Sequence, residues 1–319
     1  MTSNFSKPFH KAQKKDLHKI SIIIASKNSY DTIELCLQSI LKQSYFSDGK
    51  IEIVVVDANS KDNTKSILKR YANRVKVVCD RGEGLPKARN EGLRIATGDI
   101  VFHIDADFVF QQDAIKNCIK YIDKGYDAII NRFGIVYDMG FWRMIRSWEN
   151  IISLYYWGHA GNVPGASRYG GPRIYTKKIL ERISGHNERI RFYGEDEELR
   201  WRLIEANARI IFANDVLFNK IEENDPIAIF QKVFRYGFEM IDFLEYNKKW
   251  VSIRISGVYL NALIPLLPFV TSIIGFLHSK SIKISIALFI CKWLRMIGQS
   301  LGILCRCFYS FHNLKNFLF

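Results

Sequence analysis

Short apolar runs alternate with amphipathic segments between residues 20 and 132. Continuous runs such as ISIIIA and IEIVVV predict strands, because they are short and rich in β-branched side chains. The segments between them place apolar side chains three or four positions apart, which predicts helices. The predicted strands are residues 20–25, 51–56, 75–78 and 100–104, and the predicted helices are residues 32–43, 64–71 and 86–96. This alternation predicts an α/β fold built from βαβ units.

The predicted strands are mostly apolar without a clear alternation, which is typical of a parallel sheet covered by helices on both faces. In such a sheet the ligand lies beyond the carboxyl ends of the strands. The residues just beyond these ends are polar, so we expect them to surround one crevice. They are Ser26, Asp57, Arg81, Asp105 and Asp107.

The rest of the domain is predicted less sharply. An aromatic segment over residues 137–162 is typical either of a core-packed helix or of a helix at a membrane interface. Further along, the pattern predicts helices over residues 194–206 and 226–246, with a strand over residues 209–213 between them.

Two apolar runs lie near the C-terminus. Residues 255–277 carry no formal charge and are long enough as a helix to span the roughly 30 Å hydrocarbon core of a bilayer. Residues 284–304 contain Lys292 and Arg295, each costing about 2.5–3.5 kcal/mol at the centre of a spanning helix. The second run therefore either returns across the membrane or lies in its interface. We favour a membrane-embedded hairpin over a soluble helical pair, and the basic residues before the first run suit a cytoplasmic end.

Composition narrows the class of protein. Hydrophobic residues make up 48% of the 319 residues, which excludes a disordered chain. The six cysteines form no CxxC pair, so neither a disulfide framework nor a zinc site is indicated. No signal-peptide core follows the N-terminal lysines, so we expect the catalytic part to stay cytoplasmic. The net charge of +14 suits an anionic membrane surface. Its cations are dispersed and accompany no nucleic-acid-binding motif, so we expect no nucleic acid partner.

The most informative motif is Asp105–Ala106–Asp107, directly after a predicted strand. Two carboxylates about 5 Å apart repel by roughly 3 kcal/mol at an effective dielectric constant near 20, so a cation between them is favourable. Oxygen ligands on a short loop suit Mg²⁺ or Mn²⁺ that also binds phosphate oxygens. The alternative is a polar turn that caps the next helix.

Three other groups of residues carry candidate chemistry. Asp57 can accept hydrogen bonds from a base or a ribose, or simply cap the following helix. The segment RGEGLPKAR has too few glycines for a dinucleotide site, but cations such as Lys87 can pair with a diphosphate. The acidic cluster at residues 195–198 either stabilises a helix N-terminus or supplies a general base.

Four of these segments, in this order, resemble the motifs of family 2 glycosyltransferases of the GT-A fold. They are ISIIIASKN, EIVVVDANSKDNT, GLPKARNEGLRIATGDIVFHIDAD and GEDEELRWRL, and the resemblance covers residues 20–245. It implies a Rossmann-like mixed sheet flanked by helices, a nucleotide-diphosphate sugar donor and an inverting transfer. The chain would then comprise a basic tail over residues 1–19, a GT-A domain over residues 20–247 and a C-terminal membrane hairpin over residues 248–319.

The resemblance also implies roles for single residues. Asp57 would contact the base with Ser26 beside it, Asp105 would lie near the ribose or donor sugar, and Asp107 would bind the divalent cation, Mg²⁺ or Mn²⁺. Asp196 would deprotonate the acceptor hydroxyl. The remaining candidates are Lys87, Glu195 and Arg235 for substrate binding, with Asp105 as a second metal ligand.

The chain departs from the family pattern at two places. Many members have a metal-binding His where this chain has Asn219 and Lys220, so either Asp107 holds the metal with few other ligands or Lys220 replaces part of its charge. Phe108 and Val109 follow the two aspartates, unlike the Leu-Gln of many polyprenyl-phosphate mannosyltransferases. We therefore expect extension of a lipid-linked glycan at the cytoplasmic membrane face. The alternatives are a polyprenyl-phosphate glycosyltransferase, a non-catalytic sugar-nucleotide-binding membrane protein and a nucleotidyltransferase.

Overall fold

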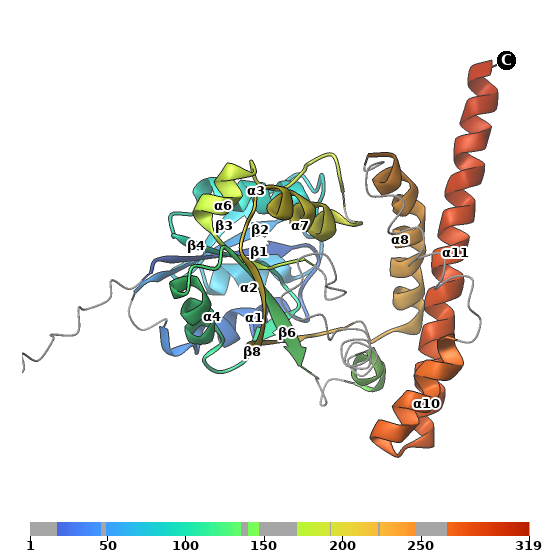
Figure 1. Cartoon of the computed structure of the whole chain (residues 1–319), viewed down its shortest axis with the longest axis horizontal. Helices are drawn as coiled ribbons and strands as arrows, with labels where there is room; N and C mark the ends of the chain where they lie inside the picture. Colours follow the sequence, from blue (N-terminus) through green and yellow to red (C-terminus); the bar gives the residue numbers. More distant parts are fainter. Residues whose placement is uncertain are drawn as a thin grey trace, which may run out of the picture.

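The computed structural model describes residues 18–45, 49–134, 140–146, 171–191, 193–222, 224–246 and 267–318. These residues form one mixed sheet with strand order β3-β2-β1-β4-β7-β6-β8-β5 and helices on both faces (Figure 1). The strands are β1 (Ile20–Ser26), β2 (Ile51–Asp57), β3 (Lys76–Cys79), β4 (Ile100–Asp105), β5 (Phe108–Phe110), β6 (Ala128–Gly134), β7 (Ile174–Thr176) and β8 (Ile210–Lys220). The helices are α1 (Ile33–Leu41), α2 (Thr64–Arg70), α3 (Leu85–Ile95), α4 (Ala114–Asp123), α6 (Lys177–Arg182), α7 (Glu195–Glu205), α8 (Pro226–Tyr246), α10 (Leu267–Ser279) and α11 (Ile282–Leu318).

The parallel half of the sheet confirms the predicted βαβ units. Strand β1 pairs in parallel with β2 and β4, and β2 pairs in parallel with β3. Each of these strands begins and ends within one residue of its predicted bounds. Because the register aligns Ser26 with Asp57 and Ala25 with Asp105, the polar residues meet at one edge of the sheet.

Two hydrophobic cores hold the helices against the sheet. On one face, Ile22 and Ile24 of β1 pack with side chains of α1, α2 and α4. On the other face, Ile23 packs with side chains of α3, α6 and α7. Successive side chains of a strand point to opposite faces, so burial on both sides requires the continuous apolar runs seen in the sequence.

The other half of the sheet was predicted poorly. Strand β8 continues to Lys220, whereas the sequence predicted a strand that ends at residue 213. Polar residues interrupt its apolar pattern where an irregularity between Asn131 and Arg132 shifts the register of β6 against β8. Strand β8 then pairs antiparallel with β5, which places Lys220 opposite Phe108.

The C-terminal helices lie beside the sheet, with α8 between it and α11 (Figure 1). In the described part of the chain, one helix is long and apolar enough to cross a membrane, at Ile282–Arg306 in α11. It contains the predicted run 284–304. The other predicted run, 255–277, is described only from Leu267 onward, and that part lies in α10.

Two further predictions lie largely outside the described residues. Of the aromatic segment 137–162, residues 140–146 are described, and Ile145 there is buried against Leu288 and Cys291 of α11. This contact favours the core-packed interpretation for that piece. Of the predicted basic tail, residues 1–17 lie outside the described part.

Candidate active site

A cleft of about 590 Å³ opens at the carboxyl edge of the parallel strands. It is lined by residues from the ends of β1, β4 and β8 and from the start of α7, together with part of α8. Of the residues predicted from sequence, those that line it are Ser26, Asp105, Asp107, Glu195, Asp196 and Arg235. The structure therefore brings the two aspartates after β4 and the acidic start of α7 into one site.

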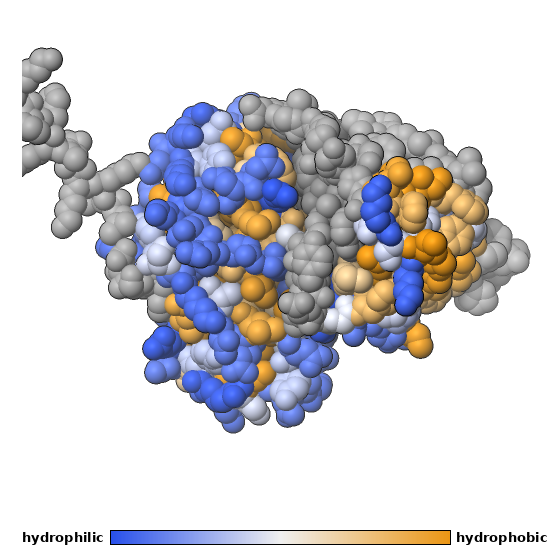
Figure 2. Space-filling model, turned by 90° about the horizontal axis from the view of Figure 1, so that it is seen from below, coloured by the Kyte–Doolittle hydropathy of each residue, from blue (hydrophilic) through white to orange (hydrophobic). Residues whose placement is uncertain are grey.

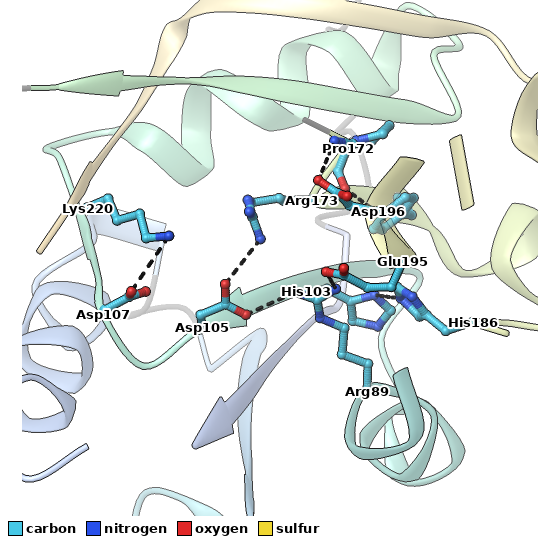
Figure 3. A network of polar contacts seen from close by, with 12 residues as sticks. Arg89, His103, Asp105, Asp107, Pro172, Arg173, His186, Glu195, Asp196 and Lys220 are labelled. Carbon is cyan, nitrogen blue, oxygen red and sulfur yellow. Dashed lines mark hydrogen bonds and ion pairs between the residues drawn. The ribbon is translucent and has the colours of Figure 1, made fainter. Parts of the chain in front are cut away.

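A buried arginine joins these two acidic groups (Figure 3). Arg89 of α3 is 3% exposed; its Nη2 donates to Asp105 Oδ1 at 2.9 Å and its Nη1 donates to Glu195 Oε1 at 3.2 Å. Arg173 Nη1 lies 3.5 Å from Asp105 Oδ2. With a guanidinium at each oxygen, the pKa of Asp105 lies well below its usual value despite burial. Asp105 is therefore a permanent anion fixed by two arginines.

Asp107 has a different environment. Its Oδ2 lies 3.7 Å from Lys220 Nζ, whereas its buried Oδ1 has no hydrogen-bond partner among the described residues. Burial and the neighbouring Asp105 raise the pKa of Asp107, and Lys220 opposes that rise. The same pair raises the pKa of Lys220. A buried carboxylate oxygen without a donor is suited to an additional cation, which would also favour the ionised form.

The residues fit a divalent cation only through this carboxylate. Asp105 is already held by Arg89 and Arg173. Within the described ranges, no three His, Cys, Asp or Glu side chains gather as a metal site. Asp107 Oδ1 is thus an unpaired carboxylate oxygen that could bind a metal, and the position expected for a histidine ligand carries the ammonium group of Lys220.

Asp196 and Glu195 begin helix α7 after Gly194, which has a positive φ of 80°. The backbone N–H of Gly171 donates to Asp196 Oδ2 at 3.1 Å. A Cβ at Gly171 would overlap the Asp196 carbonyl oxygen, so this approach requires glycine. The Asp196 carboxylate therefore faces the cleft from a rigid helix, oriented by a backbone donor.

Glu195 is buried beside Asp196. Burial, followed by the charge of Asp196, raises the pKa of Glu195 to about 7, although Arg89 acts in the opposite direction. The two neighbouring acids thus have different partners: a peptide N–H orients Asp196, whereas a buried guanidinium binds Glu195.

Two predicted residues do not line the cleft. Asp57 is 1% exposed, and its carboxylate accepts hydrogen bonds from the backbone N–H and hydroxyl of Ser60. Lys87 pairs with Glu83 at the exposed start of α3. Their proposed contacts with the base and the diphosphate stay predictions. The residue after Asp57, Ala58, does line the cleft.

The sequence analysis missed several cleft residues. Arg173 precedes the short strand β7, and Tyr193 and Glu222 lie in connecting segments without a recognisable motif. It also missed the buried contact between His186 Nε2 and His103 Nδ1, which are 2.8 Å apart (Figure 3). Burial lowers the pKa of both imidazoles well below the usual value, so the pair adds no charge beneath Arg89.

We predict that Arg89→Met lowers the free energy of unfolding by about 3–5 kcal/mol, because it leaves buried carboxylates without their partner. Arg94→Met is the matched control in the same helix, since the Arg94 side chain is 60% exposed and pairs with Glu91. The control should change the stability by less than about 0.5 kcal/mol. Chemical denaturation measures both, and equal losses would contradict the role given to Arg89.

We predict that Glu195→Gln changes how stability depends on pH. Because the pKa is about 7 in the folded chain and near 4.5 when unfolded, Glu195 stabilises the fold fully below pH 4.5 and loses this contribution as the pH rises through 7. From pH 5 to pH 8 the variant should therefore gain about 2 kcal/mol relative to the parent. Parallel stability curves in thermal unfolding would refute this assignment.

Known glycosyltransferases resemble this chain in sequence. Poly(ribitol-phosphate) beta-N-acetylglucosaminyltransferase TarS of Staphylococcus aureus is 31% identical over 116 residues, which span 35% of this chain and 20% of TarS. The putative glycosyltransferase EpsH of Bacillus subtilis is 28% identical over 122 residues, 37% of this chain and 35% of EpsH. The matched part of this chain thus spans between a fifth and about a third of these relatives.

Solved structures share the fold. The crystal structure of TarS residues 1–349 superposes with a TM-score of 0.53 at 20% identity, covering 89% of this chain and 90% of that one. The mannosyltransferase PcManGT of Pyrobaculum calidifontis, solved with GDP-Man and Mn²⁺, gives a TM-score of 0.50 at 19% identity, with 88% and 87% covered. The family model "Glycosyl transferase family 2" matches residues 21–184. The chain belongs to glycosyltransferase family 2 and has the GT-A fold, as its motifs predicted.

Proposed function

We propose that this glycosyltransferase moves a sugar from a nucleotide-diphosphate donor to an acceptor hydroxyl with inversion at the anomeric carbon. The observation that carries the proposal is the convergence of Asp105, Asp107 and Asp196 on one cleft. Structures of TarS were solved with UDP and with UDP-GlcNAc, and PcManGT with GDP-Man, which supports a nucleotide-sugar donor.

The charges of the cleft suit a diphosphate. Cations line it from β8 and α8, at Lys220, Lys232 and Arg235. Lys220 lowers the pKa of Lys232 by repulsion, and both side chains line the same cleft. The nucleoside then points toward Ser26 and the end of β2, where Asp57 is the predicted partner of the base. Fixed cations stabilise the negative charge that develops on the departing nucleoside diphosphate.

The acidic start of α7 lines the same cleft as these cations. In a single displacement, the acceptor oxygen attacks the anomeric carbon while the bond to the diphosphate breaks, which inverts that carbon. The Asp196 carboxylate takes the proton of the acceptor hydroxyl, and the N–H of Gly171 holds it in position. Glu195 stays bound to Arg89, which also binds Asp105, and so holds the start of α7 at a fixed position relative to Asp105.

Asp107 would hold a divalent cation, Mg²⁺ or Mn²⁺, through its buried Oδ1, with Asp105 next to it. Such a cation supplies further neutralisation of the diphosphate when bound. The ammonium group of Lys220 also lies beside Asp107, so the protein itself supplies part of the positive charge that a metal would bring. We therefore propose that donor binding depends on the metal only in part.

We further propose a membrane setting with a lipid-linked glycan as acceptor, at the cytoplasmic face. The apolar α11 and the net charge of +14 support this. Among the relatives, an undecaprenyl-phosphate 4-deoxy-4-formamido-L-arabinose transferase of Proteus mirabilis is 26% identical over 121 residues. That relative makes direct glycosylation of a polyprenyl phosphate the second candidate. The domain division at residue 247 belongs to the same proposal.

We predict that Asp196→Asn lowers kcat by about 10²- to 10⁴-fold, because it removes the base. The Kd of the donor should stay within about twofold, since a neutral isostere preserves the shape of the cleft. Asp99→Asn is the control, as this exposed aspartate lies at the opposite edge of the sheet, before β4. Transfer and binding are measured with a panel of nucleotide sugars. Normal turnover by Asp196→Asn would refute the assigned base.

We predict that the parent chain still binds the donor in EDTA, and that Lys220→Met weakens this metal-free binding by about 10- to 100-fold. The loss follows from removing a charged donor from the diphosphate site. Lys76→Met, on β3 and paired with Glu52, is the control and should bind as the parent does. Calorimetric titration of the donor with and without Mn²⁺ gives the readout. No binding by the parent in EDTA would overturn the role of Lys220.

A further inference from the structure

Helix α11 exposes a continuous row of aliphatic side chains. Successive members are three, four or seven positions apart, so they share one side of the helix. Helix α10 packs along the start of α11 through Ser272 and Ser285 and exposes further apolar side chains. We call these ten residues, each 41–66% exposed, the apolar stripe: Phe269, Ile273, Phe276, Leu277, Ile282, Ile286, Ile290, Ile297, Leu301 and Leu304. Figure 2 shows hydrophobic surface gathered over this C-terminal part.

Another side of α11 packs so closely against α8 that the backbones of the two helices nearly touch. A Cβ at Gly298 would lie 2.7 Å from Val233 Cγ2, and one at Gly302 would overlap the carbonyl oxygen of Phe234. On α8, Gly237 is equally close to the backbone of α11 at Gln299. Such small residues let two helices approach closely and fix their relative position. Helix α11 is thus joined to α8 along part of its length.

Helix α8 in turn forms a wall of the cleft. Lys232, Arg235 and Tyr236 line the cleft from a neighbouring side of α8, while Val233 and Gly237 are buried, facing α11. If α11 crossed a bilayer upright, this charged wall would enter the hydrocarbon with it, at a high cost per charge. The contact between α8 and α11 therefore favours an orientation of α11 along the membrane surface.

The cations of α11 support the same orientation. Lys292 follows Ile290 by two positions and Arg295 precedes Ile297 by two, so both lie away from the stripe, and the Nε of Arg295 is buried. Lys280 and Lys283 are exposed at the turn between α10 and α11. Between Ile286 and Leu304 the apolar stripe carries no charge. An apolar side with exposed cations at one end and none along its length suits a helix that lies in a membrane interface.

We propose that the apolar stripe lies in the surface of an anionic phospholipid bilayer, with α10 and α11 parallel to the membrane plane and not crossing it. The proposal rests on the membrane association proposed above and gives it a geometry. A bilayer suits the stripe better than a second copy of the chain, because two chains of net charge +14 would repel. The anionic headgroups instead attract Lys280 and Lys283.

The first test is flotation of the full chain with vesicles of phosphatidylglycerol and phosphatidylcholine, or of phosphatidylcholine alone. We expect stronger binding to the anionic vesicles and at least about tenfold weaker binding by Ile286→Glu/Ile290→Glu. Val77→Glu is the matched control, because Val77 is 43% exposed on β3, outside the stripe. Equal loss in both variants would overturn the proposal.

The second test distinguishes helices α10 and α11 that lie on the membrane surface from helices that cross the membrane. A Lys280→Cys chain in a Cys79→Ser/Cys305→Ser/Cys307→Ser background, bound to sealed vesicles, is treated with a membrane-impermeant maleimide. Labelling to the same extent with and without detergent is expected, and labelling only after detergent would show a crossing hairpin. Failure to float, with a dimer in light scattering that Ile286→Glu abolishes, would show a second copy on the stripe. Calorimetric donor binding without vesicles tests the proposed function separately.

Discussion

The candidate site depends on one buried guanidinium. Arg89 contacts Asp105 at the end of β4 and Glu195 at the start of α7, two elements some ninety residues apart in the chain. Burying such a group is costly unless each charge is paired in good geometry. The contact therefore constrains α3, β4 and α7 together: displacement of any one leaves an unpaired charge. This constraint sets the distance between Asp105 and the start of α7, where Asp196 is the proposed base.

The second constraint is the antiparallel pairing of β5 with β8. Because Phe108 is opposite Lys220, the ammonium group reaches the carboxylate of Asp107, and the N–H of Ile221 donates to the Asp107 carbonyl oxygen at 2.7 Å. The strands thus hold both the cation and the anion in place. Asp105 and Asp107 consequently differ in protonation behaviour although they are two residues apart: arginines keep the first ionised, and burial opposes ionisation of the second.

The parts that sequence predicted are those in which one physical pattern dominates. Strands β1, β2 and β4 are predominantly apolar because both of their faces are buried, and their polar ends therefore marked the cleft at Ser26 and Asp105. The family motifs located Asp196. By contrast, the roles of Arg89 and Arg173 depend on contacts between distant elements, which no local pattern encodes. The prediction ended β8 too early, because the irregularity in its pairing with β6 interrupts the pattern of apolar residues on which the prediction relies.

The C-terminal helices extend this argument beyond the sheet. If a flexible linker joined α11 to the domain, the position of α11 would not affect the cleft. Instead, α11 contacts α8 at glycines where no side chain would fit. Helix α8 carries Arg235 and Tyr236 into the cleft, so any force on α11 acts on the cleft wall through rigid helices. Such an arrangement makes the orientation of the cleft relative to a membrane a consequence of helix packing. In the proposed orientation, the segregation of side chains on α11 has a simple reason: the apolar stripe would meet lipid, while the opposite side packs against α8.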